Sequence, residues 1–174
     1  MNRQNVVTSP RLAGSVLRYH TWPTLNTQTI ADHTFHVIRI YAALFGWPNS
    51  KVTEAIVKHD MPEIVTGDPP FPIKMQNPAL KLIYNSLEDP ALEAMCVGPS
   101  PLLSVPEAAQ LKIADLLEMV EFGEVELMMG NRFAEPIIND TKKAALEKAE
   151  SISAVSTVNA FLNRKTDTWR TSHG

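Results

Sequence analysis

The chain has 174 residues, a single cysteine and a formal net charge of -3. A chain of this length buries roughly 70% of its extended surface on folding, which is enough for one hydrophobic core, and its weakly acidic balance supplies no basic field for a nucleic acid polymer. Cys96 cannot form an internal disulfide, the N-terminus leads into no apolar signal core, and no apolar run is long enough to span a bilayer. We therefore expect one domain over residues 1–174, in a reducing cytoplasm and without a membrane partner.

The first part of the chain predicts two helices separated by an irregular loop. Ser9-Pro10 is typical of an N-cap followed by a proline in the first turn, and it opens a helix that ends near Arg18. Residues 19–28 predict a loop. Thr29-Ile30-Ala31-Asp32 then resembles a capping box, which predicts a second helix that stops at Gly46.

The middle of the chain predicts a third helix and a long shaped loop. Ser50 is the expected cap of that helix, and Pro62 interrupts its backbone hydrogen bonding. Residues 67–78 contain four prolines, too many for a regular element but suitable for a stiff loop that walls an active site. Residues 80–87 show only a weak helical pattern.

The C-terminal part predicts two long helices. A capping box at Ser104–Glu107 opens a helix over residues 105–129, and a last helix is expected over residues 137–161. We expect a core from about residue 9 to residue 162 and a polar tail over residues 163–174 that frays. No run of alternating β-branched residues occurs, so the sequence predicts an all-α bundle of about six helices.

Four potential metal ligands occur in the order His33, His59-Asp60 and Asp115. Two imidazoles and two carboxylates suit Zn²⁺, Mn²⁺, Co²⁺ or Fe²⁺, since mixed nitrogen and oxygen ligation excludes none of these ions. Each residue alone also has an ordinary structural explanation. Asp60, for example, could form a capping box with Glu63 for a helix segment that begins at Pro62, without any metal.

Asp115 is harder to explain without a partner, because its predicted helix face also carries apolar residues that should be buried. Burying an unpaired carboxylate costs several kcal/mol. The carboxylate must therefore be exposed, paired with Lys112 or bound to a cation, and the sequence leaves these alternatives open.

The order of these residues resembles the HD phosphohydrolase superfamily, and within it the bacterial 5′-deoxynucleotidases. The resemblance covers roughly residues 11–131. The motifs that carry it are His33, His59-Asp60-x-x-Glu63, the Thr66-Gly67-Asp68 turn, Lys74 in the proline-rich loop, and Lys112-x-x-Asp115. Two departures bring the chain closer to the small phage enzymes that hydrolyse dATP: Arg18-Tyr19 stands where the family commonly shows an Arg-Trp pair, and the chain is shorter, with a compact C-terminal region.

The resemblance implies an HD-type helical bundle that holds a divalent transition metal, namely Zn²⁺, Co²⁺ or Mn²⁺. Its implied ligands are His33, His59, Asp60 and Asp115. Such an ion would polarise a phosphoryl oxygen and lower the pKa of bound water toward neutrality. Glu63 and Asp68 are then the carboxylates that activate water and transfer protons, although either could instead be a helix-end or turn residue.

Cations and apolar side chains near these motifs are candidates for substrate contacts. The candidates for phosphate binding are Arg18, Lys74, Lys112 and His36, and those for base or sugar binding are Tyr19, Trp22 and Ile30. Arginine and lysine suit phosphate oxygens, and an aromatic face can stack on a purine. In isolation each of these residues would be read as a solvated charge or as ordinary packing.

The resemblance predicts a metal-dependent phosphohydrolase that releases the deoxynucleoside from 2′-deoxynucleotides. The favoured substrate is dATP, with triphosphate as the second product, as for a phage enzyme in the host cytoplasm. A general 5′-deoxymononucleotidase is the alternative within this class. A catalytically silent HD scaffold that binds a nucleotide, and a purely structural helical module, are the rivals from other classes. Because relatives self-associate, we also expect a homo-oligomer.

Overall fold

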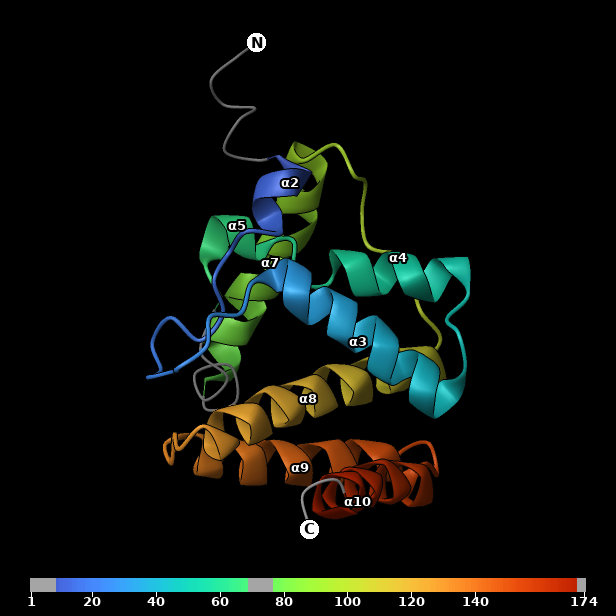
Figure 1. Cartoon of the computed structure of the whole chain (residues 1–174). Coiled ribbons are helices and arrows are strands. Elements are labelled where there is room, and N and C mark those ends of the chain that lie inside the picture. Colours follow the sequence, from blue (N-terminus) through green and yellow to red (C-terminus); the bar gives the residue numbers. More distant parts are fainter. Residues whose placement is uncertain (1–8, 69–76, 172–174) are drawn as a thin grey trace. The chain divides into compact units, whose positions relative to one another are not determined.

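The computed structural model describes residues 9–68 and 77–171, which fold into helices joined by turns and loops (Figure 1). The helices are α2 (Pro10–Ala13), α3 (Ile30–Phe45), α4 (Ser50–Lys58), α5 (Glu63–Thr66), α7 (Pro78–Ala94), α8 (Val105–Met128), α9 (Ala134–Glu150) and α10 (Val155–Thr171). Within the described ranges, extended pairing is limited to one isolated antiparallel bridge between Leu17 and Thr29. The predicted all-α fold class is therefore confirmed. No described helix has both the length and the apolar character needed to cross a membrane.

The chain divides into two compact units. The first comprises Met1–His36 and Ser50–Leu102, and the second comprises Val37–Asn49 and Leu103–Gly174. Helix α3 begins in the first unit and ends in the second. The expectation of a single domain over the whole chain stays a prediction.

The first unit contains a small hydrophobic cluster that packs α2, α5 and α7 together. Its buried members are Ala13, Met61, Leu92 and Met95, with Ile64 and Val97 packed against them. Because Met61 directly follows His59 and Asp60 in the sequence, the cluster fixes the turn after α4 against α2 and the end of α7.

The first helix is shorter than predicted, since it ends at Ala13 rather than near Arg18. The backbone then leaves the helix and pairs with the segment before α3, where the Arg18 N–H donates to the Gln28 carbonyl at 2.9 Å. This pairing occupies backbone N–H and C=O groups, such as the Arg18 N–H and the Gly14 carbonyl, that would form helical hydrogen bonds if the helix continued to Arg18. It also closes the predicted irregular loop of residues 19–28 at its base.

Both predicted capping boxes are present. At the start of α3 the Asp32 carboxylate accepts the Thr29 N–H at 3.0 Å, and the Thr29 hydroxyl accepts the Asp32 N–H at 3.2 Å. Ser104 and Glu107 form the same reciprocal pair at the start of α8. Helix α3 ends, as predicted, before Gly46, whose φ of 84° is left-handed.

Helix α7 is longer than the weak pattern over residues 80–87 predicted. The Asn77 side chain accepts the Leu80 N–H at 3.2 Å and caps the helix, and Pro78 occupies its first turn. The helix then continues through Pro90 to Ala94.

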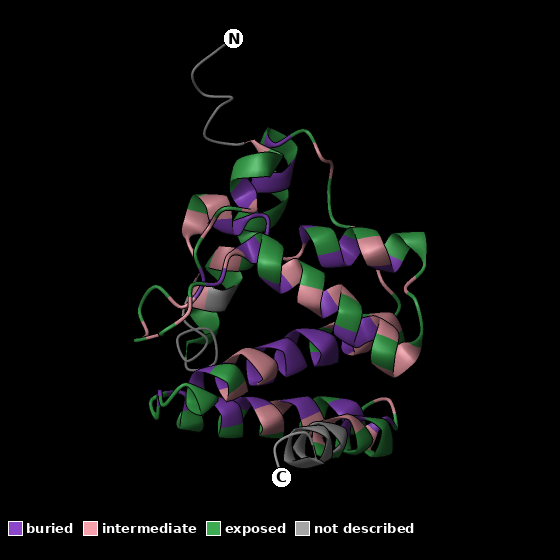
Figure 2. Cartoon of the chain, in the orientation of Figure 1, coloured by how far each residue is buried: buried purple, intermediate pink, exposed green. Residues whose placement is uncertain are grey.

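In the second unit, α9 packs along α8 (Figure 1). The middle of α8 is almost entirely buried, as its purple colour in Figure 2 shows. The cluster between the two helices consists of Val120, Ala134 and Ile138, with Leu162 of α10 packed against it.

The predicted single helix over residues 137–161 is wrong, because the chain turns between α9 and α10. The Ser151 hydroxyl donates to the Lys148 carbonyl at 2.7 Å, and Ser153 has a left-handed φ of 56°. Serine hydroxyls compete with helical hydrogen bonding in this way. Helix α10 then continues to Thr171 and includes residues that were expected to fray.

Candidate metal centre

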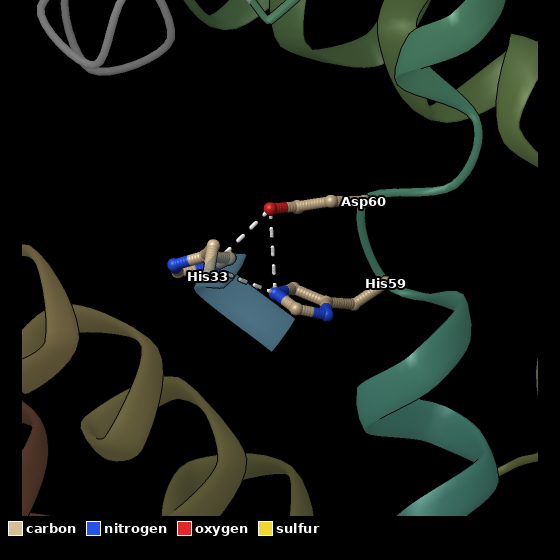
Figure 3. Close-up of side chains that lie close together, drawn as sticks. All are labelled: His33, His59 and Asp60. Atoms are coloured by element: carbon tan, nitrogen blue, oxygen red, sulfur yellow. Dashed lines mark hydrogen bonds and ion pairs between the residues drawn. The ribbon is translucent and has the colours of Figure 1, made fainter. Parts of the chain in front are cut away.

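The side chains of His33, His59 and Asp60 point toward one another in the first unit (Figure 3). The two histidine Nε2 atoms lie 3.3 Å apart, and Asp60 Oδ2 lies 3.3 Å from Nε2 of His33 and 3.4 Å from Nε2 of His59. His33 is fully buried, and the other two side chains are mostly buried. Three potential ligand atoms thus meet within a space that one metal ion could fill.

His59 and Asp60 are adjacent in the sequence, and they can share a site because the helix ends before them. Adjacent residues inside an α-helix project about 100° apart. Helix α4 ends at Lys58, and the chain then turns so that the Met61 N–H donates to the Lys58 carbonyl at 3.2 Å. This turn lets both ligand atoms face His33.

The capping box of α3 sets the direction of His33. The His33 N–H donates to the Thr29 carbonyl at 3.0 Å, so His33 lies in the first helical turn. Asp32 is exposed, and the next residue, about 100° further around the helix, faces the interior. The Thr29 side chain, followed by the Thr29 backbone N–H, lowers the pKa of Asp32 and keeps the capping carboxylate charged.

His59 is held in the tautomer that metal binding requires. Its Nδ1 lies 2.5 Å from the Ile56 carbonyl oxygen, which can only accept a hydrogen bond, so Nδ1 carries the proton. In the neutral ring, Nε2 then presents its lone pair to the cluster. Nitrogen and oxygen ligands about 2.0–2.1 Å from a tetrahedral ion lie about 3.3–3.4 Å from one another. The cluster's three separations of 3.3, 3.3 and 3.4 Å therefore fit a divalent transition metal.

Asp60 also pairs with Arg18. Nη1 of Arg18 donates to Oδ2 of Asp60 at 2.5 Å, and the two side chains are 6% and 13% exposed. The alternative role of Asp60 as a helix cap is not observed, because α5 has Pro62 at its N-cap and no side-chain cap hydrogen bond. The sequence analysis predicts that Arg18 contacts a substrate phosphate. In the structure its positive charge lies directly beside the cluster of His33, His59 and Asp60.

Comparison with known proteins identifies the family. The family described as "5'-deoxynucleotidase YfbR-like" matches residues 14–167. This chain belongs to that family. The predicted resemblance to the HD-domain 5′-deoxynucleotidases is therefore confirmed.

Two relatives can be compared with this YfbR-like chain. A 5′-deoxynucleotidase of Photobacterium profundum is 32% identical over an alignment of 109 residues, and the match covers 56% of this chain and 53% of the relative. The chain thus spans about half the length of that relative. The solved structure of the cyanophage S-2L HD phosphohydrolase DatZ, bound to dA and one catalytic Zn²⁺ ion, matches with a TM-score of 0.72 and 22% identity, over 91% of this chain and 95% of DatZ. At this identity the match shows a shared fold.

The loop of residues 18–28 carries two of the residues predicted to contact the base. Tyr19 has a left-handed φ of 56°, and its N–H donates to Oδ2 of Asp68 at 2.9 Å. The Arg18 guanidinium lies 5.5 Å from the centroid of the Tyr19 ring. The Trp22 N–H donates to the Tyr19 carbonyl at 2.8 Å, while its buried indole Nε1 has no hydrogen-bond partner among the described residues.

Three further predicted site residues lie in helices of the first unit: Ile30 and His36 in α3, and Glu63 in α5. Ile30 and Glu63 are buried at the starts of α3 and α5. His36 is partly buried one turn after His33, and its ring lies 5.2 Å from that of Phe35. Their proposed contacts with water or substrate stay predictions.

The predicted pair Lys112 and Asp115 lies on α8 in the second unit. Lys112 Nζ donates to Oδ2 of Asp115 at 2.5 Å, so the ion pair that the sequence left open is present. Asp115 is 7% exposed. Its role as a fourth metal ligand stays a prediction. Lys74, predicted to bind phosphate, lies outside the described residues.

Sequence reasoning missed Lys58, a buried lysine directly before His59 and Asp60. Its Nζ donates to Oε1 of Glu54 at 2.5 Å and to the Pro99 carbonyl at 3.0 Å. Lysine is rarely buried unless its charge is paired. Lys58 therefore ties the end of α4 to the segment after α7. A lysine in the last turn of a helix is common, so no sequence signal would have identified this anchor.

Proposed function

We propose that the protein is a metal-dependent phosphohydrolase that cleaves the 5′ phosphoester of 2′-deoxynucleotides. The observation that carries the proposal is the convergence of His33, His59 and Asp60 in a chain of the YfbR-like family. Water would attack the phosphorus that is bound to the 5′ oxygen, and the bond between this phosphorus and the 5′ oxygen would break. The deoxynucleoside would leave after its 5′ oxygen takes up a proton.

The ion would be held by imidazole and carboxylate groups: His33, His59, Asp60 and, as the predicted fourth ligand, Asp115. When bound, a divalent ion supplies Lewis acidity to the phosphoryl group and to the attacking water. Arg18 would donate to a substrate phosphate oxygen, because its guanidinium is already fixed beside Asp60. Glu63, by resemblance, would accept a proton from the attacking water.

We propose dATP as the favoured substrate, with deoxyadenosine and triphosphate as products. The binding of dA to DatZ, which shares this fold, supports this choice. Tyr19, Trp22 and Ile30 would then contact the base or sugar, and His36, Lys74 and Lys112 the phosphate groups. The alternative is a general 5′-deoxymononucleotidase, which the family description and the Photobacterium relative favour. A cytoplasmic location and a homo-oligomeric state stay predictions.

The test incubates protein loaded with Co²⁺, Mn²⁺ or Zn²⁺ with dATP, dGTP, dAMP and ATP, and resolves the products by chromatography. Deoxyadenosine with intact triphosphate supports the dATP reaction. Orthophosphate from monophosphates alone supports the general 5′-deoxymononucleotidase. No turnover with any metal and substrate would contradict the enzymatic proposal and favour a silent nucleotide-binding scaffold.

The metal site is tested separately by metal content. His59→Ala should lose stoichiometric metal, whereas His20→Ala, which removes an exposed histidine outside the cluster, should retain it. Asp115→Ala should lose metal and activity together if Asp115 is the fourth ligand. Normal metal content and activity in Asp115→Ala would instead show that Asp115 is not a metal ligand and would favour a structural role, such as its ion pair with Lys112.

A further inference from the structure

The loop that presents Arg18 and Tyr19 contains a conformation that needs support. Tyr19 has a φ of 56°, in the left-handed region that residues with a side chain rarely adopt, and bulky residues least of all. The loop is closed at its base by the hydrogen bond from the Arg18 N–H to the Gln28 carbonyl. This bond fixes the start of the loop but not the conformation of the next residue.

Asp68 contacts the backbone at this strained position. Its Oδ2 accepts the Tyr19 N–H at 2.9 Å, across 49 positions of sequence. On the other side of the residue, the Tyr19 carbonyl accepts the Trp22 N–H at 2.8 Å. Both backbone polar groups of Tyr19 are therefore satisfied in the left-handed conformation, one of them by a carboxylate. Hydrogen bonds to ionised acceptors are among the stronger ones in proteins.

The direction of the Tyr19 ring, beside Arg18, depends on this conformation. Arg18 immediately precedes Tyr19, pairs with Asp60 in the cluster of His33, His59 and Asp60, and lies over the Tyr19 ring. A change of φ at Tyr19 would redirect its ring and the chain that follows it. Residues in sparsely populated conformations persist when surrounding contacts determine them, and such residues gather at functional sites.

We propose that Asp68 is a positioning residue: its carboxylate oxygen holds Tyr19 in the left-handed conformation and so orients the Tyr19 ring and the loop that follows it toward the substrate. This inference rests on the proposed phosphohydrolase function. It differs from the proton-transfer role that the resemblance predicts, because positioning needs a hydrogen-bond acceptor at Asp68, whereas proton transfer needs an ionisable group.

The variants Asp68→Asn and Asp68→Ala separate the two roles. Asparagine has nearly the same shape and keeps a side-chain oxygen that can accept the Tyr19 N–H, while alanine has no acceptor. In metal-loaded enzyme, Asp68→Asn should lower kcat/KM by less than about tenfold, and Asp68→Ala by about 10²-fold, as expected for a displaced substrate contact. Asp89→Ala, at an exposed position of α7, is the matched control for loss of one carboxylate.

Loss of proton transfer would give a different pattern. Both variants would then fall together, by about 10²-fold or more, and the pH profile of Asp68→Asn would lose one limb. Either result overturns the positioning role. Activity of Asp68→Asn close to wild type, with an unchanged pH profile, supports it.

A measurement without turnover keeps this inference separate from the proposed function. Amide exchange at Tyr19, followed by NMR, should be slow in wild type and Asp68→Asn, and about tenfold or more faster in Asp68→Ala. Equal exchange in all three proteins overturns the inference even if the enzyme is active. If the wild type hydrolyses no deoxynucleotide, the phosphohydrolase proposal fails, and the exchange rates still decide whether Asp68 holds Tyr19.

Discussion

The packing of α9 against α8 predicts that Gly123→Ala lowers stability, although alanine is the better helix former. In a helix interior, alanine is favoured over glycine by about 1 kcal/mol. A Cβ at Gly123 would lie 2.7 Å from Cγ1 and 3.4 Å from Cδ1 of Ile138, whereas carbon atoms in contact prefer about 3.5–4.0 Å. Ile138 is 4% exposed and stiff at χ1, so it cannot rotate away freely.

The net effect follows from these opposing contributions. Overpacking of a well-filled core costs about 1–3 kcal/mol, and a cost of about 2 kcal/mol, in the middle of this range, exceeds the gain of about 1 kcal/mol in helix propensity. We expect Gly123→Ala to lower the free energy of unfolding by about 1 kcal/mol, which corresponds to a fall in Tm of about 2–4 °C for a chain of this size. Denaturant unfolding followed by circular dichroism measures this change, and an unchanged slope shows that the denatured state is unaffected.

The decisive comparison is made in the Ile138→Ala background. That substitution should itself cost about 2–5 kcal/mol. It also removes the atom that collides with the new Cβ, so Gly123→Ala should now stabilise the protein by about 1 kcal/mol. The coupling between the two sites is then about 2 kcal/mol. Ala108→Gly, at an exposed position of α8, calibrates the propensity contribution without a change in packing. If Gly123→Ala has the same effect in both backgrounds, the steric reasoning is wrong.

Three other substitutions test the supports of the candidate site. Asp32→Ala removes the capping carboxylate and should lower the free energy of unfolding by about 0.5–1 kcal/mol at pH 7. Because Thr29 lowers the pKa of Asp32 in the folded state, this stabilisation is present above the ordinary pKa of an aspartate and is lost as the pH falls through the lowered pKa. Equal costs at neutral and strongly acidic pH would contradict this expectation. Lys58→Met removes the donor to the Pro99 carbonyl and should cost about 1–3 kcal/mol in denaturant unfolding, and a cost near zero would show that Lys58 is no anchor. Trp22→Ala should raise KM for the deoxynucleotide by about tenfold or more, since stacking on a base is worth about 1–3 kcal/mol, at unchanged metal content; an unchanged KM would remove Trp22 from the base contact.

Local signals explain which parts of the fold could be predicted. The capping box at Thr29 and Asp32 involves residues three positions apart, so the sequence contains the whole interaction. The end of the first helix could not be predicted in this way. It depends on pairing between Arg18 and Gln28, which is a tertiary contact. The break at Ser153 gave only a weak signal, because serine is merely neutral to unfavourable inside helices and its left-handed conformation is set by context.

The candidate site likewise has features that could be predicted from the sequence and features that depend on tertiary contacts. His33 and the adjacent pair His59-Asp60 could be found because metal binding restricts the side chains that can serve and because their order resembles the HD family. The pairing of Arg18 with Asp60 could not, since it joins residues 42 positions apart and arginine on a loop is usually solvated. The sequence therefore indicated the possible metal ligands, whereas the position of the Arg18 charge beside them depends on the tertiary fold.

The proposed roles assign metal binding and substrate selection to different parts of the first unit. The cluster residues lie at the start of α3 and just after the end of α4, where a capping box and the buried Lys58 fix the backbone. Tyr19 and Trp22 instead lie on a loop held by a few backbone hydrogen bonds and by Asp68. Loops tolerate substitution better than the helices that carry them. We therefore expect changes within this loop to alter which nucleotide is accepted, while His33, His59 and Asp60 keep their geometry.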